Sequence, residues 1–393
     1  MGKDINKTRK REETHMAQFK KIGVLTSGGD APGMNAVIRA IVNCASQNDV
    51  EVVGIYEGYR GLLENDTKHL QPQDVASSIS RGGTILYTAR CDKYNSPEGV
   101  ALAYDRCKEL GIDGVIAIGG DGTFRGATDL AKTGIPTIGI PGTIDNDITA
   151  TDYTVGYDTA MNTVVEMCDR LRDTCESHAR CDIVEVMGRN AGYIALNAGI
   201  AVGATAILLK EFDYDEDAII EKMIAERKSN KARSFIIVMS EGLDGYGFGD
   251  YGEELAKKIE ARSGEEGCKI ETRFARLAHV VRGGNPTLRD RLVASRMGAE
   301  AVRLLLEGKS NLVVCEREGK IVTSEIKYAL ALDKMFKNEY AFKKCPSPKY
   351  NREKNLEGFD AEQIKGMEEY CQKKYDELKD LYKVANTLAF IEE

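Results

Sequence analysis

The chain has 393 residues, of which 42% are hydrophobic and 30% are charged, and its formal net charge is −8. This composition excludes a disordered chain, and the acidic balance argues against a nucleic-acid-binding protein. No apolar run approaches the ~20 residues that cross a bilayer, so we expect neither nucleic acid nor membrane as a partner. Ten scattered cysteines without a CxxC pair indicate reduced thiols and a cytoplasmic location.

An alternation of short strands and helices begins at Lys20, after a polar segment, residues 1–19, that we expect to be a flexible tail. Glycine and proline bound the β-rich runs, and apolar residues recur three and four apart between them. Strands are predicted at 21–25, 51–56, 114–119 and 135–140, and helices at 33–45 and 97–111. This alternation predicts mostly parallel strands with helices on both faces.

The pattern restarts after residues 150–158, which we interpret as a domain boundary. A helix is predicted at 159–178, and buried strands at 181–188, 205–210 and 234–240. The sequence therefore predicts an α/β protein with two layered α/β units.

The segment after residue 333 differs in composition. Residues 343–355 are rich in Pro, Lys and Asn and predict a surface connection. A helix is predicted at 360–388, with Asp360 and Gln363 as a capping pair. Whether this helix packs on its own subunit or contacts another stays open.

Three segments that combine glycine with an acid each follow a predicted strand. They are TSGGDAPGMNA (26–36), GGDGTFRG (119–126) and PGTIDND (141–147). Ligands of an open parallel sheet bind outside the carboxyl ends of its strands, so we expect the three loops to converge on one site. The first of them, residues 26–36, is neither a Walker A loop nor a GxGxxG fingerprint.

Each loop has a chemical interpretation and a structural alternative. Gly28 and Gly29 allow close approach of backbone N–H groups to phosphate oxygens, or simply form a strand–helix turn. Asp121, with little steric cover, suits Mg²⁺ shared with phosphates, or is a helix N-cap. Asp145 and Asp147 alternate on what we expect to be an extended segment, so that both face one side, where one accepts a proton and the other approaches a metal.

Positive charge for an anionic substrate is offered by short clusters in the second half. They contain Arg180, Arg189, Arg273, His279 and Arg282. Solvated salt bridges, and a core position for the histidine, are the alternatives.

Taken together, the segments GVLTSGGDAPGMNA, GGDGT, PGTIDNDI, DRLRDT…SHAR, VEVMGR and HVVRGGNP occur in an order that resembles the ATP-dependent 6-phosphofructokinases of bacterial type. The resemblance runs from Lys21 to about residue 333. It implies an enzyme that transfers the γ-phosphoryl group of MgATP to the 1-hydroxyl of fructose 6-phosphate, giving fructose 1,6-bisphosphate and ADP in glycolysis.

The resemblance also assigns residues to roles. Catalytic roles fall on Asp145 as the base and on Thr143, Asp147 and Arg189. ATP binding falls on Gly29, Tyr59, Arg90, Cys91, Gly120, Asp121, Gly122, Thr123 and Gly126, with Asp121 as the Mg²⁺ ligand. Sugar-phosphate binding falls on Thr143, Asp145, Arg180, Met187, Gly188, Arg189, Glu241, Arg273, His279 and Arg282. Arg180 and Arg273 match arginines that complete a neighbouring subunit's site, which implies a homotetramer.

The implied fold has two Rossmann-like three-layer α/β domains with mostly parallel sheets and the active site in the cleft between them. The nucleotide-binding domain would comprise residues 20–156 with 283–333, and the sugar-phosphate-binding domain residues 157–282. Residues 334–393 form a C-terminal helical extension without counterpart in the short bacterial enzymes.

Departures from the family pattern concern donor and effector. The pyrophosphate-using branch usually carries Asp at the position of Gly122 and Lys at that of Gly142, so the glycines favour ATP over pyrophosphate. A non-catalytic sugar-phosphate-binding regulatory subunit would be expected to lose Asp121, Asp145 or Asp147. An aromatic that usually follows Arg90 is Cys91 here. Of the effector-site residues only Arg39 and Arg172 are retained, the others falling on Asn43, Pro72, Thr205 and Ala232. These departures predict weak or absent activation by ADP and weak inhibition by phosphoenolpyruvate at that site.

Overall fold

The computed structural model describes residues 19–189, 191–243, 250–344 and 346–389. Residues 1–18 of the tail expected from the sequence lie outside this range. Phe19, the last residue of that tail, is 8% exposed and packs in the hydrophobic core. Within the described residues, no helix has the length and apolar character needed to cross a bilayer.

The first sheet has seven strands in the order β11-β10-β5-β4-β1-β2-β3. Its inner strands are parallel, and the edge strands β3 and β11 pair antiparallel to their neighbours. The bounds are β1 Lys21–Ser27, β2 Glu51–Ile55, β3 Thr67–Leu70, β4 Gly114–Gly119, β5 Thr137–Pro141, β10 Leu312–Arg317 and β11 Lys320–Glu325. The strand order reverses between β1 and β4, which is where ligands of open α/β sheets bind.

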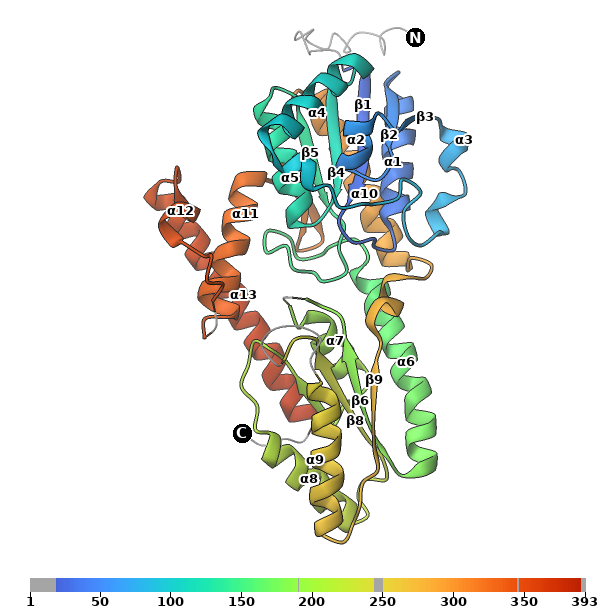
Figure 1. Ribbon diagram of the computed structural model, residues 1–393, viewed down its shortest axis with the longest axis vertical. Helices are drawn as coiled ribbons and strands as arrows, with labels where there is room; N and C mark the ends of the chain where they lie inside the picture. The colour runs from blue at the N-terminus through green and yellow to red at the C-terminus, as the bar shows by residue number, and fades with distance from the viewer. Residues whose placement is uncertain (1–18, 190, 244–249, 345, 390–393) are drawn as a thin grey trace, which may run out of the picture.

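Helices cover both faces of this sheet (Figure 1). This cover is required because successive side chains of β4 point to opposite faces and all of them are buried. Ile116 and Ile118 pack in the cluster that contains α1 and α10, while Val115 and Ala117 pack against α4, α5 and α11 (Ile326–Met335). The helices are α1 Met34–Ser46, α2 Tyr59–Glu64, α3 Pro72–Val75, α4 Pro97–Leu110, α5 Asp121–Lys132 and α10 Leu288–Leu306. Burial on both faces explains why the inner strands are continuously apolar.

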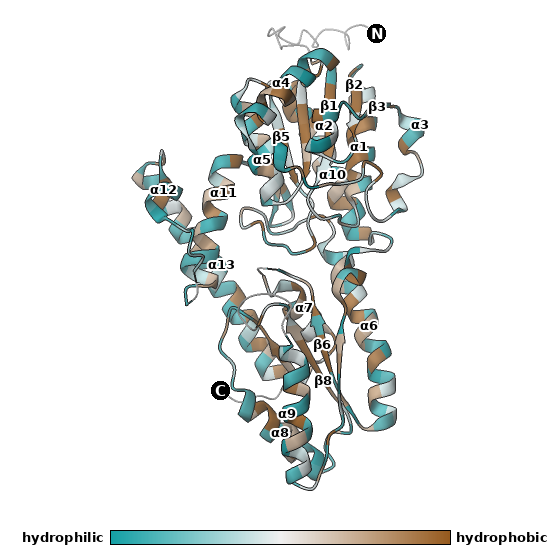
Figure 2. Cartoon of the chain, viewed as in Figure 1, coloured by the Kyte–Doolittle hydropathy of each residue, from teal (hydrophilic) through white to brown (hydrophobic). Residues whose placement is uncertain are grey.

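The second sheet is fully parallel, with the order β7-β8-β6-β9. Its strands are β6 Cys181–Val186, β7 Ala206–Leu208, β8 Phe235–Ser240 and β9 Thr272–Arg276. Helices α8 and α9 pack on one face, with α6 and α7 on the other. Their bounds are α6 Tyr157–His178, α7 Tyr193–Ala201, α8 Glu216–Lys228 and α9 Tyr251–Glu265. The strands of both sheets are mostly hydrophobic, and the outer faces of the surrounding helices are mostly hydrophilic (Figure 2). The expected α/β fold is confirmed.

The chain crosses between the two sheets beside a buried carboxylate, Asp290 in the first turn of α10. This side chain has no exposed surface. It accepts hydrogen bonds from the backbone N–H groups of Gly156 at 2.7 Å and Thr159 at 2.9 Å, and from the hydroxyls of Tyr153 and Thr159. One carboxylate therefore holds the start of α6 against the start of α10.

The C-terminal extension lies along both halves of the molecule (Figure 1). Helix α11 (Ile326–Met335) continues into a π-helix, η4 (Phe336–Ala341), and α12 (Arg352–Leu356) precedes α13 (Ala361–Leu388). The expected capping pair of Asp360 and Gln363 is confirmed. Helix α13 contacts α11 near its start, and α7 and β7 further along, where the Tyr382 hydroxyl donates to the Ile207 carbonyl at 3.4 Å. One face of this helix is therefore packed on its own chain.

Replacing Asp290 is expected to destabilise the fold strongly. In Asp290→Ala the hydroxyls and N–H groups at the crossing lose a charged acceptor while they stay buried, which costs about 3–5 kcal/mol. Chemical denaturation measures this loss. The exposed Asp105→Ala in α4 is the matched control and should change stability by no more than about 0.5 kcal/mol. Equal stability of the two variants would show that the crossing does not depend on Asp290.

Candidate active site

A cavity of about 300 Å³ lies where the loops after β1, β4 and β5 converge. Its walls include every residue that the resemblance assigned to ATP, together with Thr143, Asp145 and Asp147. Arg189 and Arg282 reach it from the second half of the chain. The full lining is Ser27, Gly28, Gly29, Tyr59, Ala89, Arg90, Cys91, Asp92, Tyr94, Asn95, Gly120, Asp121, Gly122, Thr123, Gly126, Gly142, Thr143, Asp145, Asp147, Arg189 and Arg282. The expected convergence of the three loops at one sheet edge is confirmed.

Two hydrogen bonds connect the three loops. The Thr123 hydroxyl donates to the Ser27 carbonyl at 3.0 Å, and the Gly142 N–H donates to the Gly119 carbonyl at 3.1 Å. A Cβ at Gly29 would lie 2.3 Å from Nη1 of Arg282, so a side chain there would displace the end of this arginine. The absence of a side chain therefore allows an arginine from the second half to approach the first loop.

Asp121 is the first residue of α5, and Gly120, not Asp121, is its N-cap. One carboxylate oxygen accepts the Gly122 N–H at 2.7 Å, and the other pairs with Arg125 one turn along the helix. A negative charge in the first turn is favoured by the helix dipole. The N-cap alternative is therefore wrong, and Asp121 stands at the mouth of the cavity.

The loop after β5 is a turn and not the extended segment expected from the sequence. Asn146 has a left-handed backbone with φ of 50°. Its side chain accepts the Thr154 N–H at 3.0 Å and donates to the Asp152 carbonyl at 3.2 Å, which fixes the turn. Asp145 and Asp147 flank this turn, and both still line the cavity. Their shared side thus comes from a turn held by Asn146, not from strand alternation.

Asp145 is a buried carboxylate in an acidic surrounding. It is 6% exposed, and its Oδ1 has no hydrogen-bond partner in the described part of the chain. Burial raises the pKa of Asp145 to about 6, the Asp147 charge adds to this effect, and Arg282 opposes it. The carboxylate is therefore ionised at neutral pH with an oxygen free to accept a proton.

Two arginines face these acids from the second half. Arg189 follows the end of β6, and its backbone N–H, like that of Gly188, donates to the Glu241 carboxylate. Arg282 ends the 3₁₀-helix η3 (Ala278–Arg282) and donates to the Asp30 carbonyl at 3.3 Å. The cavity thus combines carboxylates from one sheet with guanidinium groups positioned by the other, an arrangement suited to phosphoryl groups.

The comparisons identify the family. The family model described as phosphofructokinase matches residues 21–305. The chain belongs to the phosphofructokinase family. It is 49% identical over 308 residues to the ATP-dependent 6-phosphofructokinases of Halalkalibacterium halodurans and Bacillus subtilis, covering 78% of this chain and 93% of each relative. With ATP-dependent 6-phosphofructokinase 1 of Clostridium perfringens it shares 48% over 318 residues, 81% of this chain and 96% of the relative.

Solved phosphofructokinases share the fold. The structure of the enzyme from Saccharomyces cerevisiae aligns with a TM-score of 0.75 and 29% identity, over 93% of this chain and 50% of the yeast chain. That from Pichia pastoris in the T-state aligns with a TM-score of 0.74 and 31% identity, over 90% of this chain and 39% of the other. This chain therefore spans half or less of those two chains.

Four further sugar-phosphate candidates follow strands of the second sheet but do not line the cavity. Met187 and Gly188 directly follow β6, and Glu241 directly follows β8. His279 lies in η3 and is exposed, so the core alternative for this histidine is wrong. All four lie at or just beyond the carboxyl ends of strands β6, β8 and β9, the same edge from which Arg189 and Arg282 enter the cavity.

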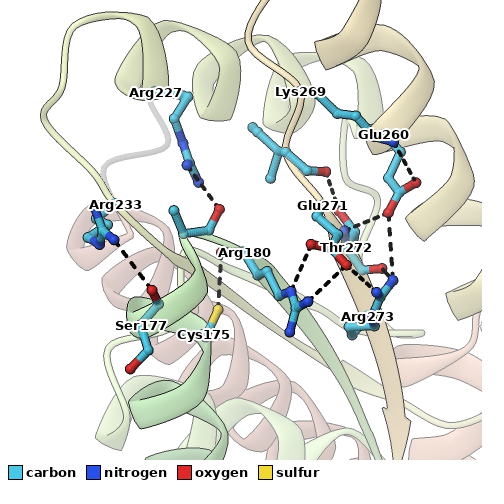
Figure 3. A network of polar contacts seen from close by, with 12 residues as sticks. Cys175, Ser177, Arg180, Arg227, Arg233, Glu260, Lys269, Glu271, Thr272 and Arg273 are labelled. Carbon is cyan, nitrogen blue, oxygen red and sulfur yellow. Dashed lines mark hydrogen bonds and ion pairs between the residues drawn. The ribbon is translucent and has the colours of Figure 1, made fainter.

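Arg180 and Arg273 lie at the opposite edge of the second sheet (Figure 3). Arg180 precedes β6, and Arg273 is the second residue of β9. Glu271 holds them together, because it pairs with both nitrogens of the Arg180 fork at 2.9 and 3.0 Å and also with Arg273. A full strand length separates these arginines from the carboxyl edge, and neither lines this chain's cavity.

Sequence reasoning missed five lining residues: Ser27, Ala89, Asp92, Tyr94 and Asn95. Three of them lie in the 3₁₀-helix η2 (Asp92–Asn95), which is too short for a periodic signal. Tyr94 stacks on Tyr59 with ring centroids 4.1 Å apart, and its hydroxyl donates to the Gly126 carbonyl at 2.8 Å. Only the position of η2 in the sequence, directly after the ATP-binding candidates Arg90 and Cys91, could have indicated these residues.

Asp145→Asn is expected to stabilise the fold at neutral pH. The folded-state pKa of Asp145 lies above its ordinary value, so the wild type loses stability as pH rises from about 4 to about 6, and the variant lacks this loss. The difference in unfolding free energy should grow to about 2–3 kcal/mol above pH 7, at about 1.4 kcal/mol per pKa unit. Urea denaturation at pH 5, 6, 7 and 8 measures it. A difference independent of pH would contradict the buried, titrating carboxylate.

Proposed function

We propose that this chain is an ATP-dependent 6-phosphofructokinase, which transfers the γ-phosphoryl group of ATP to the 1-hydroxyl of fructose 6-phosphate. The observation that carries the proposal is one cavity in which a free carboxylate oxygen of Asp145, the glycine loops and two arginines meet. The curated bacterial relatives at 46–49% identity support it by their names. The products are fructose 1,6-bisphosphate and ADP.

Asp145 acts as the base in this proposal. Its carboxylate accepts the proton of the sugar's 1-hydroxyl as the oxygen attacks the terminal phosphorus, and its raised pKa makes it a stronger acceptor than an exposed aspartate. The Asp145 N–H donates to the Thr143 hydroxyl at 3.3 Å, which helps to hold the backbone of this turn. Arg189 and Arg282 neutralise charge on the transferred group and on the sugar phosphate.

Mg²⁺ fits the nucleotide side of the cavity. No group of three or more acidic, His or Cys side chains is placed to hold a metal in the residues that the structure describes. Asp121 offers a single carboxylate at an open mouth, since a Cβ on Gly120 or Gly122 would meet nothing within 4 Å. One protein carboxylate with phosphates and waters is the set that Mg²⁺ takes in kinases. Asp121, which pairs with Arg125 in this structure, would hold the ion, and the ion would supply charge neutralisation to the phosphates.

A neighbouring subunit completes the sugar-phosphate site in the proposed homotetramer. Arg180 and Arg273 are held side by side by Glu271, and Arg273 is exposed. Paired guanidinium groups at this edge of the sheet are suited to a phosphate on another copy of the chain. ATP and fructose 6-phosphate are then the small-molecule partners.

The decisive experiment compares turnover of the wild type and Asp145→Asn with ATP, fructose 6-phosphate and Mg²⁺. We expect kcat to fall on the order of 10³-fold or more with little change in sugar-phosphate binding, because only the proton acceptor is lost. The exposed Asp105→Asn is the matched control. Equal slowness of wild type and Asp145→Asn would instead identify a sugar-phosphate-binding subunit without catalysis.

The donor can be tested at Gly122. Because a side chain here enters open space, Gly122→Asp should fold normally while its carboxylate repels and crowds the nucleotide phosphates. We expect kcat/KM for ATP to fall by about 10-fold or more, with Gly122→Asn less affected because it adds bulk without charge. Initial rates with ATP and with pyrophosphate measure this. A wild type faster with pyrophosphate would overturn the ATP assignment.

A further inference from the structure

The C-terminal extension reaches the candidate catalytic turn through one buried lysine. Lys337 lies in the π-helix η4, and π-helical turns are frequently found at functional sites. Its side chain is 17% exposed, and its Nζ is 2.9 Å from Oδ2 of Asp147 and 2.9 Å from Oδ2 of Asp333. The extension thus contacts an acid that lines the active-site cavity.

Asp333, the residue of α11 that directly precedes the extension, adds a second connection to the same turn. Its Oδ1 accepts hydrogen bonds from the Thr149 hydroxyl at 2.9 Å and from the Thr149 N–H at 3.3 Å. Asp333 and Lys337 are one helical turn apart, so together they hold residues 147–149 from one side. A buried charge network of this kind contributes more to a defined geometry than to net stability.

Asp147 lies between two cavities. It lines the active-site cavity and also a second cavity of about 260 Å³, whose walls include Tyr193, Glu211, Lys337 and Lys374. Asp147 is therefore the residue through which the packing of the extension is transmitted to Asp145, two positions away. Burial alone would lower the pKa of Lys337, but Asp333 and Asp147 raise it above its ordinary value, so the lysine stays charged.

Lys337 lies beyond the segment that the family model matches, which ends at residue 305, whereas its partner Asp147 lies within that segment. Resting on the proposed function, we propose that Lys337 is a positioning residue that fixes the Asp147 carboxylate and the turn at 143–149 in the geometry required for phosphoryl transfer. The extension is then part of the catalytic apparatus, although no residue of it need touch substrate.

Lys337→Met tests the proposal, with Lys374→Met as the matched control. Lys374 is a similarly buried extension lysine in the same cavity, but it pairs with Asp152, which does not line the active-site cavity. Lys337→Met loses its ion pairs to Asp147 and Asp333, and Lys374→Met loses its pair to the more exposed Asp152, so both should melt at a lower temperature, Lys337→Met by more. We expect kcat to fall about 10-fold or more only in Lys337→Met, with KM for ATP and fructose 6-phosphate changed less than about threefold.

A double variant separates positioning from general destabilisation. If Lys337 acts through Asp147, Lys337→Met combined with Asp147→Asn should be no slower than Asp147→Asn alone. The inference would be overturned if the losses in kcat of the two single variants multiplied in the double variant. Equal kcat in Lys337→Met and Lys374→Met would also overturn it. Lys337→Gln, which keeps a hydrogen-bond donor, is measured in the same way if the methionine variant does not fold. An inactive wild type would instead refute the proposed function itself.

Discussion

The central constraint on this structure is negative charge gathered at one sheet edge. The carboxyl ends of β1, β4 and β5 meet at the reversal of strand order, so Asp121, Asp145 and Asp147 line one small cavity. Like charges at this density are unfavourable unless cations offset them. Arg125 pairs with Asp121 and Lys337 pairs with Asp147, whereas Oδ1 of Asp145 has no hydrogen-bond partner among the residues that the structure describes. The unpaired acid is the one proposed to react.

The two-sheet architecture follows from the same constraint. The guanidinium groups of Arg189 and Arg282 come from the far sheet, and the cavity exists only while the two halves keep their relative position. Asp290 holds the crossing on one side, and α13 packs along both halves on the other. A hydrophobic contact alone would allow sliding, whereas hydrogen bonds to one buried carboxylate fix direction as well as distance.

Much of this arrangement could be predicted from the sequence because its signals are local. The continuous apolar runs of β4 and β8, and the capping pair at Asp360, each depend on only a few neighbouring residues. The turn at Asn146 could not be read in this way, since its conformation depends on hydrogen bonds to residues six and eight positions away. The Lys337 contact joins residues 190 positions apart in sequence, and no periodicity encodes such a pairing.

Three cations near this cavity, Arg189, Arg282 and Lys337, differ in burial. Their burial indicates which of them are fixed before a ligand binds and which can move in response to it. Arg189 is exposed and Arg282 is half-buried, so each can turn toward a phosphate that arrives with a ligand. Lys337 is enclosed between two carboxylates and keeps its charge and position whether or not a ligand is present. A fixed cation behind the turn lowers repulsion between Asp147 and Asp145 before substrate binds, and mobile cations in front respond to the substrate. Catalytic preorganisation requires a cation that is already fixed in place. The proposed positioning role of Lys337, which lies beyond residue 305, therefore accounts for its burial against this turn.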